Sequence, residues 1–174
     1  MNDVIKAMEE RRSTRAFLPD MVPEALIRQV AEASTWAATG KGRQSPIILA
    51  ITRKDLRDKL SAMNAKFMGK ADFDPFYGAP LVLVVLADRT IPTYLYDGSL
   101  VMGNLMLAAE SLGLDSCWIH RAKEEFDSDT GKDLLRSLGI EGDYEGIGHC
   151  VLGYPADEKK PGAPRKADYI HFIR

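Results

Sequence analysis

Leu81-Val82-Leu83-Val84-Val85-Leu86 is an unbroken run of large aliphatic side chains near the middle of the chain. A run without the polar alternation of a half-exposed strand predicts a central strand that is covered on both faces. Covering both faces of a sheet takes helices, and helical patterns stand on either side of this run. The sequence therefore predicts a layered domain with residues 81–86 in its core.

Shorter stretches of strand and helix character surround the central run. Apolar, β-branched stretches predict further strands at 46–52, 115–119 and 149–154. Helical spacing of apolar residues predicts helices at 4–8, 23–33, 54–63, 97–112 and 132–138. These elements do not follow regular strand–helix–strand units. We therefore expect an α+β fold, with a mixed or antiparallel central sheet flanked by helices.

The predicted helix at 97–112 is apolar around most of its circumference, with Leu100, Val101, Leu105 and Leu112 among its apolar positions. A helix of this kind is buried on most sides. The sequence leaves open whether its neighbours belong to the same core or to a second subunit.

Composition indicates a single domain over residues 1–174. Apolar residues make up 45% and charged residues 28% of the 174, the balance of an ordinary soluble globular protein. A net charge of −2 gives no bulk attraction to nucleic acid or to an anionic membrane, so we expect neither as a partner. The first residues lack the apolar run of a signal peptide, and two cysteines fit a reducing compartment. These features predict a cytoplasmic protein.

A dense cationic segment, Arg11-Arg12-Ser13-Thr14-Arg15, follows the first predicted helix. Arginine stays charged and presents a planar fork of donors that suits phosphate or carboxylate oxygens. The segment, which also contains hydroxyl groups, is therefore suited to a phosphorylated cofactor. It is also compatible with cations that end a helix and lie in solvent.

The common catalytic signatures do not occur in this sequence: no glycine-rich dinucleotide motif follows a strand, and there is no phosphate loop or serine elbow. Cysteines and histidines at 117, 120, 149 and 150 suggest a metal site or a cysteine nucleophile. However, neighbours on a strand point to opposite faces, so His149 and Cys150 do not easily share one site. Anion-binding pieces without an obvious base are typical of proteins whose cofactor carries the chemistry.

These pieces stand in a fixed order with other short motifs. The segments are Arg11-Arg12-Ser13 with Arg15, then Ala38-Thr39-Gly40-Lys41-Gly42-Arg43-Gln44, residues 98–109, residues 112–119, Leu152-Gly153-Tyr154-Pro155 and Pro164-Arg165-Lys166. In order and spacing the sequence resembles the FMN-dependent nitroreductase family, from about residue 5 to the C-terminus. The resemblance implies a nitroreductase-like fold and a homodimer that binds FMN at the subunit interface.

The resemblance also implies which residues hold the phosphate end of FMN. Arg11 and Ser13 would contact the phosphate and ribityl chain, with Arg12 beside them. Arg165 and Lys166 would complete the phosphate site. The C-terminal extension 164–174, which carries this last pair, is expected to pack on the partner subunit.

The ring end of FMN would be held by both subunits. Arg15 would reach the pyrimidine edge of the flavin, where a fixed cation stabilises the negative charge of the reduced ring. The other implied ring contacts are Ala38, Thr39 and Gly40 from the partner subunit, Trp118, Ile119 and His120 with a backbone N–H near flavin N5, and Asn64 near the ribityl chain or ring edge. Trp118 and Ile119 are also compatible with plain strand core.

The sequence departs from the family pattern near the substrate side. Gly42 stands where the family loop usually carries asparagine, so we expect no side-chain contact there. The chain is short for the family and leaves little room for a helical lid. The aromatic turn 73–77, or Tyr94 and Tyr96, would either roof the substrate pocket or pack in the core.

The activity implied by the resemblance is that of an FMN-dependent NAD(P)H oxidoreductase. NADH or NADPH would donate a hydride to flavin N5, and a nitroaromatic, quinone or related small electrophile would take the electrons in a second, ping-pong half-reaction. No side chain is needed as acid or base. Two alternatives stay open: a non-catalytic flavin-binding module for storage or redox sensing, and a metal-dependent hydrolase built on Cys117, His120 and His149.

Overall fold

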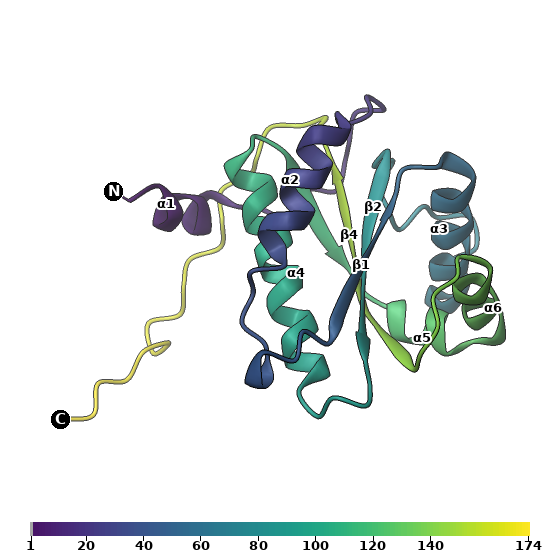
Figure 1. Cartoon of the computed structure of the whole chain (residues 1–174). Coiled ribbons are helices and arrows are strands. Elements are labelled where there is room, and N and C mark those ends of the chain that lie inside the picture. Colours follow the sequence, from purple (N-terminus) through teal and green to yellow (C-terminus); the bar gives the residue numbers. More distant parts are fainter. Residues whose placement is uncertain (1) are drawn as a thin grey trace.

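The computed structural model describes residues 2–174, so Met1, the first residue of the predicted domain, lies outside the described residues. A four-stranded sheet stands between two layers of helices (Figure 1). In chain order the elements are α1 (Asp3–Glu10), α2 (Glu24–Ser34), the 3-10 turn η1 (Gly40–Gly42), β1 (Pro46–Ile51), α3 (Lys54–Met68), β2 (Leu81–Asp88), α4 (Tyr94–Ser111), β3 (Asp115–Ile119), α5 (Ala122–Asp127), α6 (Asp129–Ser137) and β4 (Tyr144–Gly153). No helix among the described residues is long and apolar enough to cross a membrane.

The central run forms β2 and lies in the interior of the sheet, as predicted. The strand order is β1-β2-β4-β3, and every pairing is antiparallel. Of the two sheet types that the sequence predicts, mixed or antiparallel, the structure has the antiparallel one. Residues 81–87 of β2 are buried. Antiparallel partners on both sides accept and donate the backbone hydrogen bonds of β2. The packing on the two faces of the strand therefore depends on its side chains.

Alternate residues of β2 enter two separate cores. Val82, Val84 and Leu86 face the layer of α3, α5 and α6, whereas Leu83 and Val85 face the layer of α2 and α4 (Figure 1). A buried side chain of this size stabilises the fold by about 1.5–3 kcal/mol. The strand therefore contributes to both cores, which explains why its sequence shows no polar alternation.

Three elements differ most from the sequence-based expectation. Helix α3 continues to Met68, five residues past its predicted end. β4 begins at Tyr144, five residues before the predicted start. The prediction missed its first half because Gly146 and Gly148 are residues typical of a turn. Both glycines are required by close contacts: a Cβ atom at Gly146 would lie 2.2 Å from the carbonyl oxygen of Ala122, and one at Gly148 would lie 2.2 Å from Nε1 of Trp118. Helix α5 was not predicted, since six residues are too few to show a period.

Helix α4 is only partly covered within one chain. Val101, Met102 and Leu105 are buried against the sheet. Leu95 and Leu100, in contrast, are about half exposed. The all-round apolar character of this helix is thus not explained by the core of a single chain.

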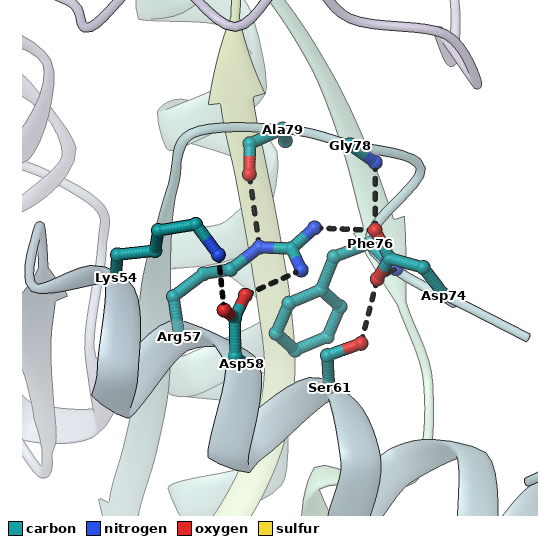
Figure 2. Close-up of polar contacts among 8 residues, drawn as sticks. All are labelled: Lys54, Arg57, Asp58, Ser61, Asp74, Phe76, Gly78 and Ala79. Carbon is teal, nitrogen blue, oxygen red and sulfur yellow. Dashed lines mark hydrogen bonds and ion pairs between the residues drawn. The ribbon is translucent and has the colours of Figure 1, made fainter.

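The guanidinium of Arg57 ties helix α3 to the loop before β2 (Figure 2). Its Nε donates to the carbonyl oxygen of Ala79 at 3.0 Å, and its Nη2 donates to Asp74 at 2.6 Å. Nη1 lies 3.1 Å from a carboxylate oxygen of Asp58, and the guanidinium stands 5.3 Å from the centre of the Phe76 ring. This buried cation therefore fixes the aromatic turn 73–77 against α3.

Asp74 is the acceptor at the centre of the same cluster (Figure 2). Besides Arg57 it accepts hydrogen bonds from Ser61 Oγ at 2.6 Å and from the backbone N–H groups of Phe76 and Gly78 at 2.9 and 2.8 Å. Burial raises the pKa of the Asp74 carboxyl, but these hydrogen bonds outweigh burial and hold the pKa below its usual value. The carboxylate is therefore charged in the folded protein near neutral pH.

We expect Arg57→Ala to lower the free energy of unfolding by about 2–3 kcal/mol, because it strips a buried carbonyl and a carboxylate of their donor. Denaturant unfolding measures the loss, and Arg53→Ala, an exposed arginine just before α3, serves as the control with a loss below about 0.5 kcal/mol.

The lowered pKa of Asp74 stabilises the fold above about pH 4, and this contribution disappears as the pH falls through its folded pKa. A difference between wild type and Arg57→Ala that grew on acidification would contradict this assignment.

Candidate functional site

The cationic segment lies along β3 at the edge of the sheet. Ser13 forms a parallel bridge with Ser116, and the backbone N–H of Thr14 donates to the carbonyl oxygen of Ser116 at 3.1 Å. The hydroxyl of Thr14 also donates to the carboxylate of Asp115. Backbone pairing therefore holds the segment in an extended conformation instead of leaving it as a free helix end.

Extended pairing turns alternate cations of the segment toward the same strand. Burial raises the pKa of the Cys117 thiol, and Arg15, Ser13 and Arg11 oppose that rise. Nη1 of Arg11 is buried and finds no hydrogen-bond acceptor among residues 2–174. A buried charged donor without an acceptor is costly, and an anion such as a phosphate would satisfy it. The residues present thus fit an anionic ligand.

The chain after β4 returns to this segment and forms the other wall of a hollow. The backbone N–H of Ala156 donates to the carbonyl oxygen of Ala16 at 2.9 Å. Nζ of Lys159 lies 2.7 Å from Glu110 at the end of α4 and 3.1 Å from Asp115. The hollow has a volume of about 490 Å³ and is lined by residues 12–16 and 157–163. Lys159 was not predicted, because its partners lie more than forty residues away in sequence.

The loop that carries Ala38, Thr39 and Gly40 is held by one buried carboxylate. Asp97 in α4 accepts hydrogen bonds from the backbone N–H of Gly40 at 2.9 Å, from Ser45 Oγ at 2.8 Å and from Thr93 Oγ1 at 3.0 Å. A Cβ atom at position 40 would lie 2.3 Å from Thr93 Oγ1, so only glycine fits. Sequence reasoning missed Asp97, although an acidic residue inside an apolar helix is a usable signal.

Within one chain this loop and the cationic segment lie at opposite ends of α4. The loop is anchored to Asp97 near the N-terminal end of the helix, and the cationic segment connects through Asp115 and Lys159 to Glu110 near its C-terminal end. Glu110 follows Asp97 by thirteen positions, which span about 20 Å at 1.5 Å per residue. One chain does not bring the two predicted halves of the site together.

The strand end at 118–120 places its side chains on different sides. Trp118 packs with the α2 and α4 core, whereas Ile119 is buried in the other core. His120 follows the strand and is exposed. Because the side chains of Trp118 and Ile119 point to opposite faces of the sheet, they cannot both cover one ring.

Asn64 lies in the interior and not on a surface that a ligand reaches. It is fully buried, and its Nδ2 donates to the carbonyl oxygen of His120 at 2.7 Å and to Glu125 Oε1 at 2.5 Å. The sequence-based expectation of a direct ribityl or ring contact from Asn64 therefore gains no support from its position. Its link is to the backbone of the 118–120 segment.

Arg165 and Lys166 lie in an exposed tail that extends away from the sheet (Figure 1). Nζ of Lys166 stands 5.5 Å from the centre of the Tyr169 ring, and Gly162 earlier in the tail is packed so close to Arg12 that a Cβ atom there would lie 2.7 Å from Nη2. The tail thus passes the cationic segment before it leaves the domain. Residues 169–173 at the end of the tail form no strand within this chain.

Of the aromatic residues proposed as a roof, two are structural. Phe76 is fully buried, and the hydroxyl of Tyr94 donates to Glu145 at 3.2 Å. Phe73, Tyr77 and Tyr96 keep exposed surface, and the first two form an edge-to-face pair with centroids 5.7 Å apart. Only these three remain available to line a substrate pocket.

The cysteine and histidine positions do not form a metal centre. No group of three potential ligands of this kind comes together anywhere in residues 2–174. Burial raises the pKa of Cys150 to about 12 and also raises that of Cys117, so both thiols are protonated near neutral pH. A thiol in that state is a poor nucleophile. The geometry therefore does not favour the hydrolase alternative.

Fold and site together define an α+β domain with a cationic segment and a polar hollow beside an edge strand. The sequence model of the nitroreductase family matches residues 8–154 of this chain. The chain therefore belongs to the nitroreductase family.

Individual relatives and solved structures agree with this membership. The chain is 24% identical to the FMN reductase [NAD(P)H] of Bacillus subtilis over 191 residues, which cover 96% of this chain and 72% of the relative. A nitroreductase of Desulfitobacterium hafniense, solved with bound FMN, is 26% identical with a TM-score of 0.89 and full coverage of both chains. An FMN-bound nitroreductase of Bacteroides fragilis is 24% identical, with a TM-score of 0.90 and full coverage of both chains.

We expect Asp97→Ala to destabilise the protein by about 2–4 kcal/mol and to free the loop at 38–45, because three donors lose one buried acceptor. Hydrogen–deuterium exchange should show faster exchange of the Gly40 amide than in wild type. The control is Asp133→Ala, which removes a carboxylate paired only with exposed Arg136 and should leave that amide unchanged. Unchanged protection at Gly40 in Asp97→Ala would show that Asp97 does not hold the loop.

Proposed function

We propose that this nitroreductase-family protein is an FMN-dependent NAD(P)H oxidoreductase that passes electrons to a nitroaromatic, quinone or related electrophile. The observation that carries the proposal is the buried Nη1 of Arg11, which has no hydrogen-bond partner among residues 2–174, in the segment whose residues 12–16 line a polar hollow. It is supported by the FMN found in solved relatives and by the NAD(P)H named for the Bacillus subtilis relative. Two free cysteines, both buried, support a cytoplasmic location.

In this proposal the cationic segment binds the phosphate end of FMN. Arg11 and Ser13 contact the phosphate and ribityl chain with Arg12 beside them, and Arg165 and Lys166 approach from the tail. The pairing of Ser13 with Ser116 keeps these donors in place before the ligand arrives, which reduces the ordering cost of binding.

When bound, FMN would supply the redox chemistry, a ping-pong hydride transfer from NADH or NADPH to the acceptor. Arg15 lies exposed on the same extended segment, and it places a fixed positive charge where the reduced ring is negative. Both thiols near the segment are protonated and take no part as bases. The protein therefore binds and orients, and the protons come from solvent.

We propose a homodimer in which the partner subunit's Ala38, Thr39 and Gly40 complete the site. The separation of about 20 Å along α4 within one chain supports this arrangement. Exposed apolar side chains support it as well, since monomers rarely leave such groups uncovered. They lie on α1, on α4 and in the tail: Val4, Ile5, Met8, Leu95, Tyr96, Leu100, Tyr169, Ile170, Phe172 and Ile173.

The test of the proposed function is FMN binding by the purified protein. We expect a yellow protein whose melting temperature rises with added FMN, and Arg11→Ala should weaken the affinity about 10- to 100-fold, because a charge-assisted hydrogen bond is lost. Arg28→Ala, an exposed arginine on α2, is the matched control and should bind like wild type. A colourless protein that neither binds nor is stabilised by FMN would refute the proposal.

Stopped-flow mixing with NADH or NADPH then separates an enzyme from a storage or sensing module. The bound flavin of an enzyme should be reduced within seconds, whereas that of a storage or sensing module should bleach over hours.

Deleting residues 164–174 tests the dimer. We expect the shortened protein to lose dimer stability and to bind FMN more weakly, because it lacks both the apolar tail and Arg165 with Lys166. Light scattering after size-exclusion chromatography measures the mass, and Arg165→Ala/Lys166→Ala in the full-length chain separates the two causes: it should stay dimeric while losing FMN affinity. A full-length wild type that is monomeric with FMN bound would argue against the shared site.

A further inference from the structure

Three polar side chains form a fully buried network beneath the 118–120 segment. Asn64 comes from α3, Glu125 from α5 and His149 from β4, and each has no exposed surface. Neither the phosphate site nor the proposed ring contacts use Glu125 or His149. Burying such groups is costly, and apolar residues of similar volume would often stabilise a core more. The network therefore calls for a role beyond packing.

Each hydrogen on the amide nitrogen of Asn64 has its own acceptor. Nδ2 donates to Glu125 Oε1 at 2.5 Å and to the carbonyl oxygen of His120 at 2.7 Å, so both of its hydrogens are used. The other oxygen of Glu125 stands 3.3 Å from Nε2 of His149, but the pair lacks hydrogen-bond geometry, and neither atom has a hydrogen-bond partner among residues 2–174. The buried side chain of Glu125 therefore fixes the orientation of the Asn64 amide.

Two aromatic rings confine the histidine. The ring of His149 lies between Phe76, at 5.2 Å between centroids, and Phe126, at 6.3 Å. Phe76 belongs to the turn that Arg57 fixes to α3. The position of His149, which lies beside Glu125, is therefore tied to the rigid core.

Holding the His120 carbonyl also sets the direction of the next N–H. A trans peptide is planar, so its C=O and N–H groups point in opposite directions. With the His120 oxygen drawn inward to Asn64, the N–H of Arg121 points away from the buried network, on the side where His120 is exposed. This N–H donates to no backbone acceptor within residues 2–174. Arg121 has a φ of 78°, which a non-glycine residue adopts only when its surroundings hold it there.

We propose that Asn64, supported by Glu125 and His149, is a positioning residue that aims the Arg121 N–H at the edge of the flavin ring. The inference rests on the proposed function, together with the contact between the 118–120 backbone and the flavin ring that the family resemblance implies. A donor aimed at N5 hydrogen-bonds the lone pair of the oxidised ring but meets an N–H once the ring is reduced. Asn64 thus favours oxidised over reduced FMN, through the peptide and without touching the cofactor.

The experiment measures the midpoint potential, the FMN dissociation constant and the melting temperature of FMN-loaded wild type and Asn64→Leu. Leucine has a similar volume and no donor, so the peptide loses its anchor without gaining a buried charge. We expect the ratio of affinities for reduced and oxidised FMN to rise about tenfold, which is a potential about 30 mV higher for a two-electron couple.

Ser61→Ala is the matched control. Ser61 is buried on the same helix, one turn earlier, but its hydroxyl donates to Asp74 and not toward His120. It should lower the melting temperature and leave the potential unchanged. If Asn64→Leu and Ser61→Ala lower the melting temperature alike and neither moves the potential, Asn64 has only a structural role and the inference is wrong.

A second pair of variants keeps the inference testable should Asn64→Leu fail to fold. Glu125→Gln retains an oxygen that accepts from Asn64 and should keep the wild-type potential, whereas Glu125→Leu should raise it as Asn64→Leu does. Equal potentials in these two variants would overturn the inference while wild type still binds FMN. A wild-type protein that takes up no FMN would overturn the proposed function, and this inference with it.

Discussion

Removal of β2 from water on both faces is the constraint on which the rest of the structure depends. Residues 81–87 are buried, and alternate side chains enter opposite cores. Each face needs its own layer of helices, and antiparallel partners complete the backbone hydrogen bonds. The edge strand β3 then lies where the cationic segment can pair with it. The candidate site therefore depends on the pairing of the cationic segment with the edge strand β3.

Much of the fold can be predicted from local patterns. The run at 81–86 identified the central strand, and the stretch Asp115–Ile119 matched β3 at both ends. Local patterns failed where a residue serves a distant neighbour. Gly146 and Gly148 read as turn residues, yet they are glycines because Ala122 and Trp118 lie too close for a side chain.

The sequence predicted the charged residues of the candidate site but not the residues that hold them and the neighbouring loop in place. The dense arginines and the family-like order of motifs identified Arg11, Ser13 and Arg15, which the structure brings together beside Cys117. Lys159 and Asp97 were missed because their partners are distant in sequence, and no local period reports such contacts. Asn64 follows only from the family resemblance, outside the matched motifs, and its burial gives it neighbours that the sequence did not indicate.

Asp115 has a consequence for how the protein opens. One of its oxygens accepts from Thr14 and the other pairs with Lys159, so a single buried carboxylate joins the segment after α1 to the segment after β4. Two stretches from opposite ends of the polypeptide therefore share one attachment. Local unfolding at this margin is expected to be a single cooperative event and not two independent ones, so that a protease gains access to both stretches at once or to neither.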